Sequence, residues 1–127
     1  LKAAVEIKPV LIVIDTSADV FAGNENDRSQ VRQFVGMLRK VAMQANAYII
    51  VNSHPSLTGI SSGSGLSGST GWHNSVRARA YLTAAKTDRD EEPDPNLRQL
   101  EFKKSNYGHI ARSIALRWDQ GVYKPVS

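Results

Sequence analysis

The chain has 127 residues, 41% of them hydrophobic, which is enough for about one domain with a buried core. It has no cysteine, which excludes disulfide bonds and thiolate metal sites, and no run of ~18 apolar residues that a membrane helix needs. We therefore expect a cytoplasmic protein with no membrane partner. Lys and Arg outnumber Asp and Glu by 16 to 12, an excess that suits nucleic acid or nucleotide phosphate but is shared by many ordinary domains.

Two continuous apolar runs predict the central strands of a layered α/β sheet. The runs "PVLIVID" (9–15) and "AYIIVNSH" (47–54) lack the alternation of a half-exposed strand, so we expect both faces to be covered. The segment 27–47 between them predicts a helix, with a capping box formed by Asp27 and Gln30. A strand, helix, strand unit places its two strands parallel in one sheet. The apolar positions at helical spacing are Val31, Phe34, Val35, Leu38, Val41, Ala42 and Ala45.

The segment after the second run is rich in glycine and serine. "PSLTGISSGSGLSGSTG" (55–71) has no periodicity and is far longer than the ~4–6 residues of a usual connection, which indicates a functional or disordered loop. The next residues, "WHNSVRARAYLTAA", predict a helical turn and a strand, with Trp72 returning the loop to the core. The acidic segment "TDRDEEPDPN" predicts a solvated loop.

The last third of the chain predicts an antiparallel meander. Alternation places Leu100 and Phe102 on one face with Ile114, Leu116 and Trp118, so that Trp118 is expected in the core. "DQG" predicts a tight hairpin turn, with Gly121 in the left-handed conformation.

Asp15 and His54 are the first candidates for a functional site. Each follows the end of a predicted parallel strand, so we expect both at the same edge of the sheet, where open α/β folds bind ligands. Magnesium takes only one or two protein carboxylates besides substrate phosphates, so Asp15 with Thr16 nearby is a sufficient protein share. A turn cap at Asp15 and a surface histidine at position 54 are the alternatives. A change at His54 would reach the Gly/Ser loop directly, which suggests an order-to-disorder switch.

These motifs occur in one order along the chain: "VLIVIDTSADVF", a helix, "YIIVNSH", the Gly/Ser loop, "GSTGWHNSVRARAYL" and "FKKSNYG". The series resembles the C-terminal half of RecA-like P-loop ATPases, most of all the RepA-type hexameric replicative helicases of plasmids and phages. The resemblance covers residues 9–126 and implies a RecA-like three-layer α/β fold whose parallel central strands are followed by an antiparallel meander. It also implies ATP and magnesium as cofactors, a role in DNA replication, single-stranded DNA as partner, and a homo-oligomeric ring or filament.

The resemblance also implies roles for particular residues. Asp15 would be the Walker B aspartate that binds magnesium, with Thr16 beside the nucleotide, and His54 the sensor of the terminal phosphate. Arg77 would be an arginine finger for the nucleotide of the adjacent subunit. Lys104 matches a lysine that reaches across the same interface. The loop from Leu57 to Thr70 stands where the family faces single-stranded DNA, with Gly63, Ser64 and Gly65 at its tip.

The sequence departs from this pattern in three ways. Asn106 stands where the broader helicase group has a second finger arginine, so this function would rest on Arg77, with Arg79 nearby. The loop 57–70 has no Lys or Arg, so it could meet DNA only through amides and hydroxyls. No G-x-x-x-x-G-K-[ST] motif is present, so we expect residues 1–127 to be the C-terminal half of a single ATPase domain that alone does not hydrolyse ATP.

Other classes of function remain open at this point. A RecA-like recombination ATPase or mediator would share the same motifs. Asp15, Ser17 and Asp19 come close to the D-x-S-x-S metal site of von Willebrand A-like binding modules, and a non-catalytic nucleic-acid-binding module is a third option. Trp72 and His73 could stack on a base, although a core role for the tryptophan is the simpler prediction. The cations Arg28, Arg32, Arg39 and Lys40 are expected on the solvated face of their helix.

Overall fold

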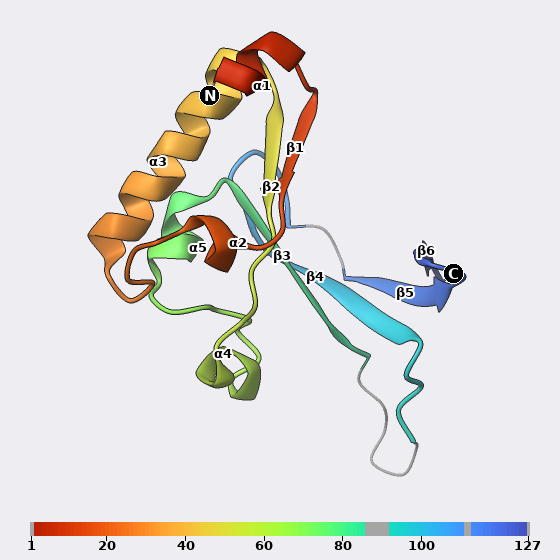
Figure 1. Ribbon diagram of the computed structural model, residues 1–127. Helices are drawn as coiled ribbons and strands as arrows, with labels where there is room; N and C mark the ends of the chain where they lie inside the picture. The colour runs from red at the N-terminus through yellow and green to blue at the C-terminus, as the bar shows by residue number, and fades with distance from the viewer. Residues whose placement is uncertain (1, 86–91, 111–112, 127) are drawn as a thin grey trace. The chain divides into compact units, whose positions relative to one another are not determined.

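The computed structural model describes residues 2–85, 92–110 and 113–126, which form two compact units, Leu1–Val76 and Arg77–Ser127. Figure 1 shows their helices and strands. The first unit contains α1 (Lys2–Ile7), β1 (Leu11–Ile14), α2 (Ser17–Val20), α3 (Arg28–Ala45), β2 (Tyr48–Val51), α4 (Leu57–Ser61) and α5 (Gly71–Ser75). The second contains β3 (Ala78–Ala84), β4 (Leu97–Ser105), β5 (Ile114–Asp119) and β6 (Val122–Pro125).

The two apolar runs form a parallel pair, as predicted. Strand β1 pairs with β2 from Leu11↔Tyr48 to Ile14↔Val51, and the two arrows lie side by side in Figure 1. The expectation that both faces are covered is wrong for the described residues, because burial alternates along both strands. One face is 46–82% exposed at Leu11, Val13, Tyr48 and Ile50. A continuous apolar run does not show which face of the strand is buried by the rest of the chain.

Helix α3 supplies most of the core of the first unit. Its predicted N-cap is confirmed, because an Asp27 carboxylate oxygen accepts from the backbone N–H groups of Ser29 (2.8 Å) and Gln30 (3.2 Å). A capping box would also have the Gln30 side chain accept from the backbone N–H of Asp27, but this bond is replaced by two others. The Gln30 side-chain amide donates to the Asp27 carboxylate, and the Gln30 side-chain oxygen accepts from the backbone N–H of Asn24. The predicted helix face is buried at Val31, Phe34, Val35 and Ala45 and half-buried at Leu38, Val41 and Ala42.

Trp72 closes this core from α5, which packs against α3, so its predicted core position is confirmed. Its ring lies 5.5 Å from that of Phe21 and 5.9 Å from that of Phe34, both edge to face. Because only 9% of Trp72 is exposed, it offers no platform for a base. Arg39 on α3 donates to the carbonyl of Ser75, 2.9 Å away, at the end of α5. The other helix cations expected in solvent, Arg28, Arg32 and Lys40, are exposed.

The Gly/Ser segment is more ordered than its composition predicts. Helix α4 occupies its first part, with the Ser56 hydroxyl accepting from the backbone N–H of Gly59 at 3.1 Å. The prediction of a stretch without secondary structure is therefore wrong at 57–61. The predicted helical turn after it is confirmed as α5, and the predicted strand as β3.

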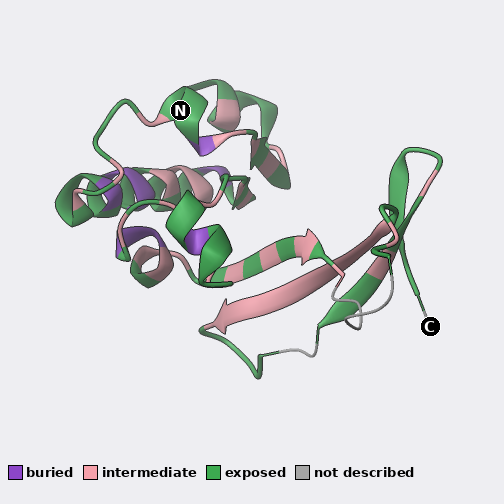
Figure 2. Cartoon of the chain, turned by 90° about the horizontal axis from the view of Figure 1, so that it is seen from below, coloured by how far each residue is buried: buried purple, intermediate pink, exposed green. Residues whose placement is uncertain are grey.

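The second unit is an antiparallel sheet in the order β3-β4-β5-β6, which confirms the predicted meander and the mixed α/β class. Its register places Leu100 opposite Ile114 and Arg98 opposite Leu116. A β-bulge between Arg79 and Ala80 shifts the register beside Lys103, so that Arg79 lies opposite Lys104. Among the described residues, all those classed as buried belong to the first unit, as the purple segments of Figure 2 show.

The hairpin β5–β6 forms around Gln120 and Gly121, which both have positive φ (48° and 95°). The predicted left-handed Gly121 is thus confirmed, and a two-residue turn of this kind matches the twist of the strands. The core position predicted for Trp118 is wrong, because 46% of its surface is exposed and its ring packs edge to face on Tyr123. Residues 87–91 of the acidic loop lie outside the described residues, and in its second half Asp94 accepts from Arg117 at 2.8 Å.

Candidate functional site

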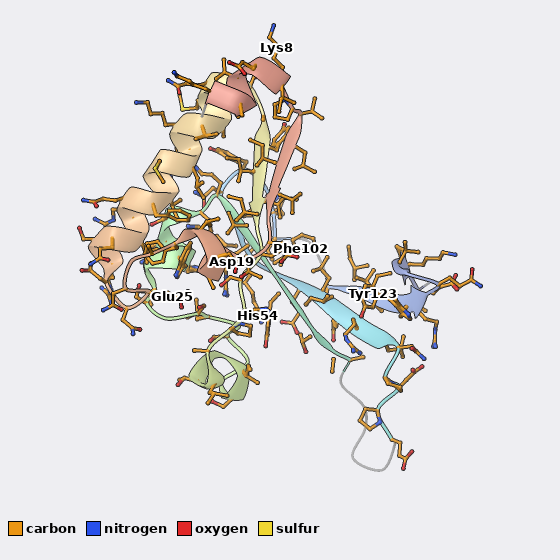
Figure 3. The ribbon with its side chains drawn as sticks, viewed as in Figure 1. Lys8, Asp19, Glu25, His54, Phe102 and Tyr123 are labelled. Atoms are coloured by element: carbon orange, nitrogen blue, oxygen red, sulfur yellow. The ribbon has the colours of Figure 1, made fainter. Side chains whose placement is uncertain are left out.

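Asp15 and His54 emerge at the same edge of the parallel pair, as predicted. Backbone bonds continue past both strands: Asn52 donates to the carbonyl of Ile14 (2.9 Å), and its own carbonyl accepts from Ser17 (2.8 Å). The turn that carries Asp15 is therefore held on both sides by one residue of the neighbouring chain segment. Both side chains are exposed, and Figure 3 labels His54 just beyond β2.

Thr16 and Asp19 are joined by two hydrogen bonds directly after Asp15. The Asp19 carboxylate accepts from the backbone N–H of Thr16 at 2.9 Å and from its hydroxyl at 3.1 Å. These bonds, the backbone one first, lower the pKa of Asp19 below its ordinary value, so Asp19 is charged at neutral pH. Because the Thr16 hydroxyl gives its hydrogen to Asp19, it can act toward a further group only as an acceptor. The T-x-x-D spacing at a helix start was the sequence signal for this pair.

The donor set at this edge fits a magnesium ion that is held mainly by nucleotide phosphates. Asp15 supplies one exposed carboxylate, which has no hydrogen-bond or ion-pair partner among the described residues. Within the same residues no cluster of three or more His, Cys, Asp or Glu side chains forms a protein-only metal site. Magnesium needs only one or two carboxylates when phosphates complete its shell. The structure does not favour a metal site of the von Willebrand A-like type, because only 1% of the surface of Ser17 is exposed.

The predicted finger residues lie together at one end of the β3–β4 ladder of the second unit. The carbonyl of Arg77 accepts from the backbone N–H of Asn106 at 3.0 Å, and the Arg77 guanidinium lies 5.9 Å from the ring centre of Tyr107. Arg79 faces Lys104 directly across the ladder. Burial lowers the pKa of Arg79, which remains a cation.

The residues predicted to meet DNA lie at the turn that follows α4. Gly63 and Gly65 both have positive φ, 66° and 63°. Gly63 is exposed, and a Cβ added to it would meet no heavy atom within 4 Å. Ser64 accepts a hydrogen bond from the Ser62 hydroxyl at 2.9 Å. The tip of this loop is therefore an ordered backbone turn.

Residues 1–59 match the model of the AAA domain family. Comparison with the curated proteins gave no match. The matched segment includes α1, β1, α2, α3 and β2, and hence the edge with Asp15 and His54. The match indicates an ATPase domain of the AAA/P-loop type, a class that binds nucleotide and usually magnesium. Across the described parts of the chain, every helix is too short or too polar to span a bilayer.

Proposed function

We propose that the chain is the C-terminal half of a single RecA-like ATPase domain in a motor that moves on single-stranded DNA. The motor is of the hexameric replicative helicase type, with ATP and magnesium as cofactors. The observation that carries this proposal is the pair Asp15 and His54 at one edge of two parallel strands, within the segment that matches the AAA domain model. A RecA-like recombination ATPase is the second candidate. A duplex-unwinding assay and a strand-exchange assay of the complete protein distinguish the two.

The first unit supplies one side of the nucleotide site in this proposal. Magnesium, when bound with ATP, neutralises charge on the phosphates. Asp15 would hold the ion, and the Thr16 hydroxyl oxygen beside it would accept a hydrogen bond from a water of the ion's shell. His54 meets the terminal phosphate and is followed after Pro55 by the segment that leads into α4. Loss of the phosphate is thus transmitted to the loop that would meet DNA at Gly63, Ser64 and Gly65.

In this proposal the second unit supplies cations to the nucleotide that is bound by a neighbouring subunit of the oligomer. The guanidinium of Arg77, directly before β3, and the ammonium of Lys104 would stabilise charge on the transferred phosphoryl group. The backbone bond between Arg77 and Asn106 supports this assignment, because it holds Arg77 beside position 106, where the helicase pattern has an arginine. In this proposal the guanidinium of Arg77 takes the role of the arginine that position 106 lacks.

The test of the nucleotide site is Asp15→Ala in the complete protein that carries the P-loop. We expect ATP turnover to fall more than about a hundredfold, since a lost metal ligand removes several kcal/mol of transition-state stabilisation. Thermal unfolding should stay unchanged, because the backbone bonds of Asn52 hold this turn. The matched control is Glu6→Ala, which removes an exposed carboxylate from α1. Equal turnover of Asp15→Ala and the control would exclude the metal role.

The intersubunit role is tested by mixing Arg77→Ala protein with wild type. Activity should fall below the value expected from dilution, because one defective subunit also impairs its neighbour. Addition of Asn106→Arg to Arg77→Ala should restore part of the activity, since both positions lie at the same end of the ladder. Arg32→Ala, on the exposed side of α3, is the control. Strictly proportional activity in the mixtures would contradict the assignment.

A further inference from the structure

Residues 56–66 form a closed ring of chain, which we call the ring. The backbone N–H and hydroxyl of Ser56 both donate to the carbonyl of Leu66, at 2.9 and 3.0 Å. Gly65 donates to the carbonyl of Gly59 at 2.9 Å, so a second bond crosses the ring. A Cβ on Gly59 would lie 2.0 Å from the Leu66 carbonyl oxygen, which shows how closely the two sides approach. The ring therefore carries its own hydrogen bonds.

Glu25 holds the chain that leaves the ring. Its backbone carbonyl accepts from the N–H of Ser69 at 3.0 Å, and its carboxylate accepts from the hydroxyl of Ser67 at 3.0 Å. Gly68 lies between them with φ of 55°, and a Cβ there would lie 2.7 Å from the Glu25 carbonyl oxygen. Three consecutive residues thus contact a single residue that lies far away in the sequence.

The segment around Glu25 is itself fixed to the helix that forms the core. Asn24 donates to the Gln30 side chain at 2.9 Å, and its carbonyl accepts from Asp27, the N-cap of α3. Figure 3 labels Glu25 in the connection between α2 and α3. Helix α2 begins directly after Asp15 and Thr16. The ring is therefore joined to the proposed nucleotide edge twice, through the chain after His54 and through Glu25.

We infer that Glu25 is a positioning residue that sets the place of the ring, and that the ring moves as one body when this contact opens. This inference deepens the proposed function, because the ring carries the proposed DNA tip. It differs from the order-to-disorder switch suggested by the position of His54 before the loop, since a closed ring with internal bonds can be displaced without melting. The carboxylate of Glu25 is the part of the contact that a substitution removes.

Amide hydrogen exchange tests this inference without requiring activity. Glu25→Ala removes the carboxylate that accepts from the Ser67 hydroxyl but keeps the backbone carbonyl that accepts from Ser69. Because the segment then opens more often, exchange of the Ser69 amide should accelerate about tenfold, the size expected for loss of one charge-assisted hydrogen bond at a partly exposed site. The ring-closing amides of Ser56 and Gly65 should change less than about twofold. Ser67→Ala should reproduce the effect, the double variant should add nothing, and Glu25→Gln should restore protection, because its amide oxygen still accepts. Unchanged Ser69 exchange, or acceleration of all three amides together, would overturn the inference.

A second arm measures ATP turnover of the complete protein with and without oligothymidylate. Glu25→Ala should leave the basal rate within about twofold and reduce the DNA-stimulated rate by at least about fivefold, with recovery in Glu25→Gln. An equal loss of both rates would show a merely structural role and contradict the positioning role. If wild type shows no stimulation by DNA, the proposed function fails, while hydrogen exchange still decides whether Glu25 holds the ring.

Discussion

Replacement of Gly59 and Gly36 by alanine should have opposite effects, although both glycines lie in helices. In Gly59→Ala the new Cβ would lie 2.0 Å from the carbonyl oxygen and 2.8 Å from the nitrogen of Leu66, so the backbone of Leu66 must move. The three bonds that close the ring contribute about 1 kcal/mol each, and alanine returns about 1 kcal/mol of helix propensity. The free energy of unfolding should fall by about 2 kcal/mol.

Gly36 is the matched control, because it lies in the exposed part of α3 and a Cβ there meets nothing within 4 Å. The same substitution should raise the free energy of unfolding by up to about 1 kcal/mol. Urea unfolding followed by circular dichroism measures both changes. Amide exchange of Ser56 and Gly65 locates the loss in the ring. If Gly59→Ala is as stable as Gly36→Ala, the close approach of the two sides of the ring is incorrect.

Three further substitutions test other parts of the first unit. Hydrogen bonds from the backbone of Gln30 and of Ser29 lower the pKa of Asp27 below its ordinary value of 3.8, so this cap stabilises the fold above that pH and is lost as the pH falls below it. Asp27→Asn should keep the cap and reduce the acid dependence of the unfolding midpoint; an identical pH profile would contradict this. Val31→Ala, at a side chain with 0% exposure, should cost about 2 kcal/mol in urea unfolding, whereas Val20→Ala, 51% exposed, should cost under about 0.5 kcal/mol. Trp72→Phe should destabilise much less than Trp72→Ala, because the buried indole N–H has no acceptor among the described residues; equal losses would show that the indole ring itself is required.

The parts of the fold that local chemistry determines could be predicted from the sequence. The helix α3 follows from apolar spacing and from the cap at Asp27, and the parallel pairing follows from two apolar runs joined by that helix. The hairpin follows from "DQG". The common edge of Asp15 and His54 then follows from topology, because parallel strands end at the same side of a sheet.

The exposure of apolar side chains and the order of the Gly/Ser segment could not be predicted in this way. Leu11, Val13 and Trp118 have the composition of core residues, but burial depends on what covers a face and not on the run itself. The ring depends on bonds between backbone groups, such as that of Ser56 with Leu66, which side-chain composition does not encode. Glu25 was missed because its partners are serines distant in sequence. The only local signals were Ser56 at an N-cap spacing from Gly59 and a glycine at position 68.

The position of Asp15 is set by backbone bonds, and this makes its carboxylate open to a clean test. The N–H and the carbonyl of Asn52 hold the chain before and after the turn, and neither bond involves the Asp15 side chain. Thr16 is held separately by Asp19. A strand that ended on a structural aspartate would instead use that carboxylate to cap the turn, which is the alternative role considered for Asp15. Here the capping bonds go to Asp19, and the exposed carboxylate of Asp15 makes no such bond among the described residues, which favours a ligand-binding role over a structural one.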